Sequence, residues 1–294
     1  MKTILVPTDF SKNAENALVY AINLTKKMPA KIILLHSFHI DYTSGYVPPN
    51  LIEKDVAEAQ ANSNTQLKAL YNKVSHHAKH PIECLSSQNF AIDAVLSAIN
   101  EKNVDLVIMG TQGANGKLGR QIFGTNSSKV IEKATCPVIT VPENEEHTDV
   151  KAITYATEYL DSDIASLQSI TDIARLFDAK INIIHVSLFD DESEQKIMES
   201  FKLKVLKHIS YKNISFKILV GNNVGQRIEG YLEEEKNIDL LVMSAHHRSL
   251  IDKLFGKSIT KVMAYYLKIP LMVFHHKRTA LDDASDHTIT KLIT

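Results

Sequence analysis

The chain has 294 residues, of which 44% are hydrophobic and 23% are charged, and its formal net charge is −1. This length allows two ordinary domains, and the balanced charge argues against a basic surface for nucleic acid. The apolar residues near the start end at Pro7, before the core of a signal peptide is complete. Elsewhere, no apolar run reaches the roughly 18 residues of a membrane span. We therefore expect a cytoplasmic protein that binds neither nucleic acid nor a membrane.

Short apolar runs alternate with helical patterns along the first half of the chain. Residues 3–7 are predicted to form a strand, and the helix that follows carries apolar side chains at helical spacing, namely Ala14, Ala17, Leu18, Ala21 and Ile22. Further strands are predicted at residues 31–38, 81–87, 105–110 and 137–141, and further helices around Leu67, Leu70 and Val74, at 91–102 and at 127–134, with a loop at 39–50. Continuous apolar strands separated by helices indicate a parallel sheet covered on both faces, which is a doubly wound α/β fold.

The second half of the chain repeats the first. Residues 2–9 resemble residues 151–158, and residues 31–38 resemble residues 180–187 at the same offset. The sequence therefore predicts two tandem five-stranded parallel sheets, in domains of residues 1–143 and 149–277. Residues 142–149 are polar and acidic, as expected of a connector, and residues 278–294 form a C-terminal tail with little pattern.

Five of the ten glycines lie between Gly110 and Asn126, directly after the fourth predicted strand. Parallel sheets bind ligands at the carboxyl ends of their strands, where this stretch meets Asp9 and the residue after His36. Asp9 offers a carboxylate to ribose hydroxyls or to an adenine amine, and bare glycine backbone lets a phosphate approach closely. The helix that starts after Gly124 presents free N–H groups to an anion. These parts together fit a nucleotide.

A purely structural interpretation competes at these positions. A glycine-rich turn before a helix is common without any ligand, and Asp9 is equally suited to cap the helix that follows it. His36 and His185 stand at equivalent strand ends. They are expected to satisfy backbone groups rather than to catalyse a reaction.

The segments ILVPTDFS, LVIMGTQG, GTN and CPVITVP together resemble the universal stress protein family, and the duplication resembles its tandem two-domain form. The resemblance covers the chain up to about residue 277. It implies a Rossmann-like fold of the adenine nucleotide alpha hydrolase-like type, with ATP as the cofactor. Its binding residues would be Thr8, Asp9, Ser37 through its backbone, Gly110, Gly113, Gly124, Thr125 and Asn126. The spacer at residues 114–123 is one residue longer than the family's pattern.

The second copy departs from this pattern. Glu158 takes the place of Asp9, while Ser244 and His247 take the places of the first two glycines. Side chains at glycine positions are expected to obstruct a phosphate. We therefore expect the second domain to bind nucleotide weakly or not at all.

Other chemistry finds little support in the sequence. Cys84 and Cys136 lack the spacing of a redox pair, so both are predicted to be buried thiols. Adjacent histidines such as His246 and His247 point in different directions, and no metal site is predicted. The glycine stretch contains no acidic residue that could hold a metal for phosphoryl transfer, so no catalytic residue is assigned.

The leading hypothesis is an ATP-binding stress-response or signalling protein, in which the bound nucleotide changes a surface that a protein partner reads. Two alternatives stay open. One is a slow ATP hydrolase with Mg²⁺ as a second cofactor, and the other is an interaction scaffold whose two sites are vestigial. The resemblance also implies an internal pseudo-dimer in which the fifth strands face each other, and it leaves a further homodimer open.

Overall fold

The computed structural model describes residues 1–42, 47–111, 125–143, 149–235, 237–245 and 269–275. Contacts within the chain divide it into two compact units, Met1–Glu146 and His147–Thr294. Gly113 and Gly124 of the expected site, and His247 of the second copy, lie outside the described residues. In the part of the chain that the structure describes, no helix is both long and apolar enough to cross a bilayer.

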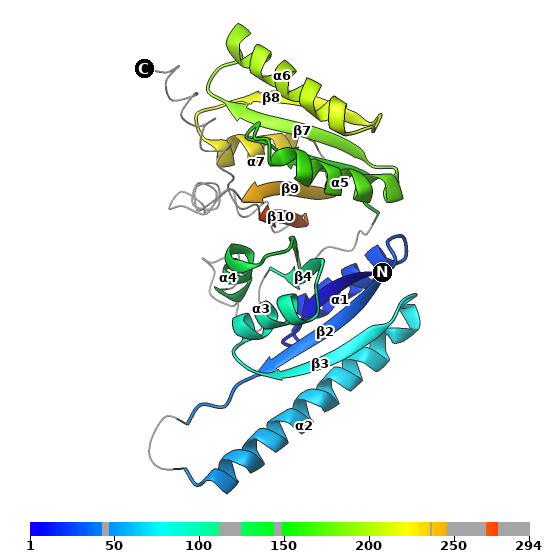
Figure 1. The fold of residues 1–294 in the computed structure, drawn as a ribbon, viewed down its shortest axis with the longest axis vertical. Helices are drawn as coiled ribbons and strands as arrows, with labels where there is room; N and C mark the ends of the chain where they lie inside the picture. Colours follow the sequence, from blue (N-terminus) through cyan, green and yellow to red (C-terminus); the bar gives the residue numbers. More distant parts are fainter. Residues whose placement is uncertain (43–46, 112–124, 144–148, 236, 246–268, 276–294) are drawn as a thin grey trace. The chain divides into compact units, whose positions relative to one another are not determined.

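Strands and helices alternate throughout the first unit (Figure 1). Its elements are β1 (Lys2–Pro7), α1 (Lys12–Thr25), β2 (Ala30–Phe38), α2 (Pro49–Val74), a 3₁₀ turn (Ser75–His77), β3 (Ile82–Gln88), α3 (Ala91–Glu101), β4 (Leu106–Gly110), α4 (Thr125–Lys133) and β5 (Val138–Val141). The strands pair in parallel in the order β3-β2-β1-β4-β5. This order confirms the predicted doubly wound sheet.

Helices cover both faces of this sheet, which explains its continuous apolar strands. Ile4, Leu5 and Val6 of β1 are 0% exposed. Lys73 of α2 forms an ion pair with Glu15 of α1, so these helices lie side by side, while α3 packs beside α4. Right-handed crossovers put the two pairs on opposite faces, because the chain runs outward from β1 to β3 and then returns to β4. Sheets of this kind bind ligands where the direction reverses, between β1 and β4.

Two predictions for the first unit are wrong in detail. α2 begins at Pro49, inside the predicted loop, and only four of its 26 residues are buried, namely Ser63, Leu67, Leu70 and Val74. Its first turns therefore carry little apolar periodicity. Cys136 is buried as predicted, and burial raises its pKa to about 11. Cys84 is exposed instead, because β3 is the edge strand of this sheet.

The second unit repeats this topology. Its elements are β6 (Ala152–Ala156), α5 (Asp163–Phe177), β7 (Lys180–Ser187), α6 (Glu192–His208), β8 (Ile214–Val220), α7 (Val224–Glu234), β9 (Leu240–Ala245) and β10 (Leu271–His275). The strands pair in parallel in the order β8-β7-β6-β9-β10, which matches the first unit strand for strand. The predicted duplication is therefore confirmed in the topology, and the counterpart of α4 lies outside the described residues.

A close contact between α1 and β4 explains the glycine at position 110. A Cβ built on Gly110 would stand 2.9 Å from the backbone oxygen of Asn13. The sequence suggested that this glycine is bare so that a phosphate can approach. In the structure a helix backbone makes the close approach, which by itself requires glycine at this position.

Replacing Gly110 by alanine is expected to lower the free energy of unfolding by about 1–3 kcal/mol, because the helix must shift away from the added methyl group. Gly230 of α7 provides the control. The atom nearest to its built Cβ is the flexible Arg227 Nη1 at 3.4 Å. Gly230→Ala is therefore expected to stabilise the helix by about 0.5–1 kcal/mol. Thermal unfolding measures both changes, and a Gly110→Ala variant that melts above the parent would contradict the packing argument.

Candidate functional site

The first part of the candidate site is the turn that leaves β1. The Thr8 amide donates to the Leu35 carbonyl at 2.8 Å, and the Thr8 hydroxyl accepts from the Phe10 amide at 3.0 Å. Phe10 has a φ of 61°, a left-handed conformation that costs a residue with a side chain about 1–2 kcal/mol. Thr8 is buried and Asp9 is exposed. The turn therefore holds the Asp9 carboxylate at the carboxyl edge of the sheet.

Asp9 does not cap α1. The N-cap is Ser11, whose hydroxyl accepts from the Ala14 amide at 3.3 Å, whereas Asp9 Oδ1 accepts from the Ser11 amide at 3.0 Å. The capping interpretation of Asp9 is therefore wrong. The role of Asp9 in the structure is to stabilise the turn by accepting a hydrogen bond from the Ser11 amide.

The N-terminus of α4 lies at the carboxyl end of β4. The Ser127 hydroxyl, in the first turn of this helix, donates to the carbonyl oxygens of Gly110 and Thr111 at 3.0 and 3.4 Å. Asn126 in the same turn is exposed. Sequence reasoning did not single out Ser127, whose signal is only its place in a run of small polar residues. This bond holds the start of α4 at this edge, and the positive end of a helix dipole favours anions.

These elements meet at one edge of the first sheet. Its strands are parallel, so Ser37 near the end of β2, the turn after β1 and Gly110 at the end of β4 share that edge. The structure thus brings together four predicted residues, Thr8, Asp9, Ser37 and Gly110. Through Ser127 it also links the helix turn of Thr125 and Asn126 to them. Gly113 and Gly124 belong to the segment that is not described.

The two strand-end histidines have different partners. His185 Nδ1 donates to the Thr157 carbonyl at 2.7 Å, which confirms the prediction that it satisfies a backbone group. His36 Nδ1 lies instead 2.7 Å from the Ser63 hydroxyl, so the prediction is wrong for His36. Burial lowers the pKa of His36, and the charge of Asp9 partly opposes this shift.

The matching turn of the second unit keeps the backbone and changes the chemistry. Tyr159 has a φ of 62°, and the Thr157 hydroxyl accepts from its amide at 2.9 Å, as in the first unit. Asp163, which is 0% exposed, accepts from the Thr157 hydroxyl at 2.6 Å and from the Tyr155 hydroxyl at 2.7 Å. In the sequence Glu158 aligns with Asp9, and nothing there marks Asp163. No helical or strand periodicity marks a buried carboxylate.

Ser244 does not obstruct the edge of the second sheet. Its side chain is buried and forms hydrogen bonds with Tyr155 at 2.7 Å and with Ser166 of α5 at 3.0 Å. The expectation that Ser244 would block a phosphate is therefore wrong, because this side chain fills the interface between helix and sheet. Gly110 meets the backbone of α1 at the corresponding interface of the first unit.

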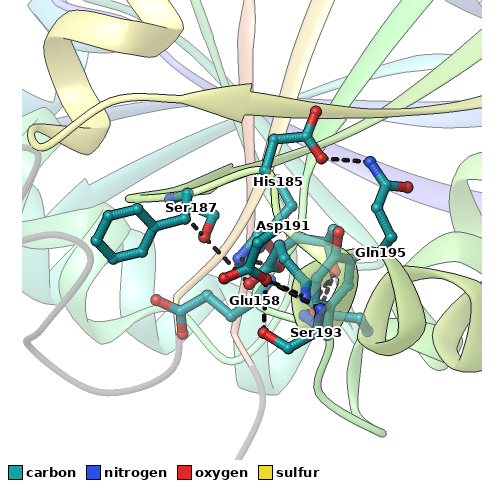
Figure 2. Close-up of polar contacts among 12 residues, drawn as sticks. Glu158, His185, Ser187, Asp191, Ser193 and Gln195 are labelled. Carbon is teal, nitrogen blue, oxygen red and sulfur yellow. Dashed lines mark hydrogen bonds and ion pairs between the residues drawn. The ribbon is translucent and has the colours of Figure 1, made fainter. Parts of the chain in front are cut away.

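Acidic side chains gather at the end of β7 (Figure 2). Ser187 donates to Glu194 Oε2 at 3.1 Å, and His185 Nε2 lies 3.7 Å from Glu194 Oε1. Asp191 caps α6, accepting from the amides of Ser193 and Glu194, each at 3.0 Å. The amides of Ser193 and Glu194 at the start of α6 are thus already bonded to the Asp191 carboxylate. Among the described residues, no three His, Cys, Asp or Glu side chains form a group that could hold a metal ion.

The two parallel sheets, each with its polar carboxyl edge, define a tandem Rossmann-like α/β protein. Residues 1–142 match the model of the Universal stress protein family. Universal stress protein Slr1230 of Synechocystis sp. is 23% identical over 293 residues, which covers 93% of this chain and 100% of that protein. Residues 1–142 therefore belong to the universal stress protein family, and the similarity to Slr1230 extends over both units.

Further comparisons agree with this assignment. A universal stress protein of Thermus aquaticus is 29% identical over 141 residues, which is 48% of this chain and 98% of that protein. The crystal structure of a universal stress protein from Archaeoglobus fulgidus has a TM-score of 0.67 and 18% identity, and the match covers 93% of this chain and 96% of that one. The structural match supports the two-domain fold.

Removal of the buried carboxylate by Asp163→Ala is expected to lower the free energy of unfolding of the second unit by about 3 kcal/mol or more, because two buried hydroxyls lose their acceptor. Asp161 is the matched control. It is paired with Lys204 at 2.8 Å, and its side chain is 60% exposed. Asp161→Ala should cost about 0–1 kcal/mol. Calorimetric unfolding compares the two variants, and equal losses would show that Asp163 is not a structural anchor.

Proposed function

We propose that the first unit binds an adenine nucleotide, in particular ATP, at the carboxyl edge of β1, β2 and β4. The hydrogen bond from Ser127 to the Gly110 carbonyl carries this proposal, because it holds the start of α4 beside the reversal of strand order. The first-turn amides and the positive dipole end of that helix are suited to phosphate groups. The family pattern adds Gly113, Gly124 and Thr125 to the same phosphate subsite.

Asp9 is suited to the sugar of the nucleotide. Its carboxylate is exposed, and the turn fixes the backbone that carries it. The Thr8 hydroxyl already accepts from the Phe10 amide. Thr8 therefore contributes by holding the turn, while Ser37 is proposed to contribute its backbone polar groups. The resemblance to the nucleotide-binding branch of the family supports ATP as the ligand.

The second unit is proposed to leave ATP unbound. Glu158 stands where the first unit has Asp9. Burial raises the pKa of Tyr159 well above its usual range, and the charges of Glu194 and Asp190 add to the shift. A phosphate at this edge would meet the same negative field, which disfavours it.

Titration of nucleotide-free protein with ATP in a calorimeter tests the proposal, and one site per chain is expected. Asp9→Asn should weaken binding by about tenfold or more, because it removes a charge-assisted hydrogen bond of about 1.5–3 kcal/mol. The matched change in the second unit, Glu158→Gln, should leave the affinity unchanged. A flat titration of folded parent protein, or two equal sites per chain, would contradict the proposal.

A further inference from the structure

A chain of three hydrogen-bonded side chains links α2 to the ends of two strands. His36 Nδ1 of β2 lies 2.7 Å from the Ser63 hydroxyl of α2, which lies 2.6 Å from the Ser86 hydroxyl of β3. A serine beside a histidine, with Asp9 nearby, is reminiscent of a nucleophile and its base. Ser63 is only 1% exposed, however, so its hydroxyl cannot meet a substrate. These three hydrogen-bonded side chains therefore serve to hold the His36 ring in place.

The His36 ring also contacts the strained turn of the candidate site. The ring centroids of Phe10 and His36 are 4.4 Å apart, with a 40° angle between the planes. Phe10 directly follows Asp9, and its φ of 61° persists only while its surroundings hold it. Support of the Phe10 ring is thus support of the backbone from which the Asp9 carboxylate extends.

The second unit shows which part of this arrangement is special to the first. Tyr159 and His185 repeat the ring contact at 4.1 Å. The His185 Nδ1, however, is bonded to the Thr157 carbonyl of the same turn, while its Nε2 lies 3.7 Å from Glu194 of α6. Of these two histidines, only His36 has its Nδ1 bonded to a helix hydroxyl among the described residues, namely that of Ser63 in α2.

We propose that His36 is a positioning residue for Asp9, and that Ser63 and Ser86 hold its ring in place. This inference rests on the proposed nucleotide binding, because it assigns His36, Ser63 and Ser86 a role in setting the geometry of that site. The His36 ring fixes the turn through Phe10. Ser63 couples the ring to α2, so the geometry of Asp9 depends on this helix as well.

The proton balance of His36 supplies a readout that a merely structural role would not change. Burial lowers the pKa of His36, so the ring is neutral near pH 7. The charge that acts on it belongs to Asp9, while α2 and β3 present the uncharged hydroxyls of Ser63 and Ser86. As the pH falls through the His36 pKa, the ring becomes a cation that draws the Asp9 carboxylate toward it. ATP should then bind more weakly.

Calorimetry of the full chain compares Ser63→Ala with a matched variant of the second unit, Ser187→Ala, whose hydroxyl donates to Glu194. Ser63→Ala is expected to reduce ATP affinity by about fivefold to tenfold, and Ser187→Ala to leave it unchanged. Between about pH 7.5 and about pH 5, affinity should fall more steeply in the parent than in His36→Gln, which has no titrating ring. The ligand's own titration is common to both proteins and cancels. Equal ATP affinities of the parent and Ser63→Ala, together with equal pH profiles of the parent and His36→Gln, would overturn the proposal.

Amide hydrogen exchange of Phe10 and Ser11 tests the same idea without any nucleotide. Both amides donate to side chains of the turn, at 3.0 Å each, so a loosened turn exposes them. Their exchange is expected to be faster in Ser63→Ala than in the parent and unchanged in Ser187→Ala. If the parent binds no ATP but these amides exchange faster in Ser63→Ala, the proposed function is wrong and the positioning role of His36 is supported. Unchanged exchange in Ser63→Ala would overturn the positioning role.

Discussion

Both carboxyl edges depend on one backbone constraint, the positive-φ turn that follows the first strand of each unit. Phe10 and Tyr159 adopt φ values of 61° and 62° although neither is glycine. In each turn a threonine hydroxyl accepts a hydrogen bond from the amide of the aromatic residue, and a histidine ring of the neighbouring strand contacts the aromatic ring. Strain of this kind persists only where such contacts hold it. The turn sets where the following polar residues stand.

The duplicated scaffold carries two different sets of polar contacts. In the first unit the backbone of α1 packs directly on Gly110, and the carboxylate of Asp9 stays exposed at the edge. In the second unit Ser244 fills the corresponding interface, and the turn closes on the buried Asp163. A carboxylate at the start of α5, that of Asp163, has thus become part of the core of the second unit. This difference is the physical basis for proposing nucleotide binding in one unit alone.

Similarity to the universal stress protein family accounts for the fold, whereas function depends on the site. The edge of the first unit combines an exposed carboxylate with a helix start held by Ser127. The edge of the second combines a capped helix start with several carboxylates. Two units with the same strand order therefore present different polar groups at the described parts of their edges. The proposed role of His36 extends this contrast to the helix behind the first site.

The sequence by itself determined the alternation of strands and helices, the duplication and the parallel character of the sheets, because apolar periodicity and repeated segments are local signals. It also identified Asp9, Ser37 and Gly110 as residues of one edge, since parallel strands end together. Only the tertiary structure decided why residue 110 is glycine and where the side chain of Ser244 points. It also decided that Asp163 is the buried partner of Thr157, and that Ser63 is the buried partner of His36. Those facts depend on which backbone or hydroxyl approaches from a distant segment, and no local pattern of residues records such an approach.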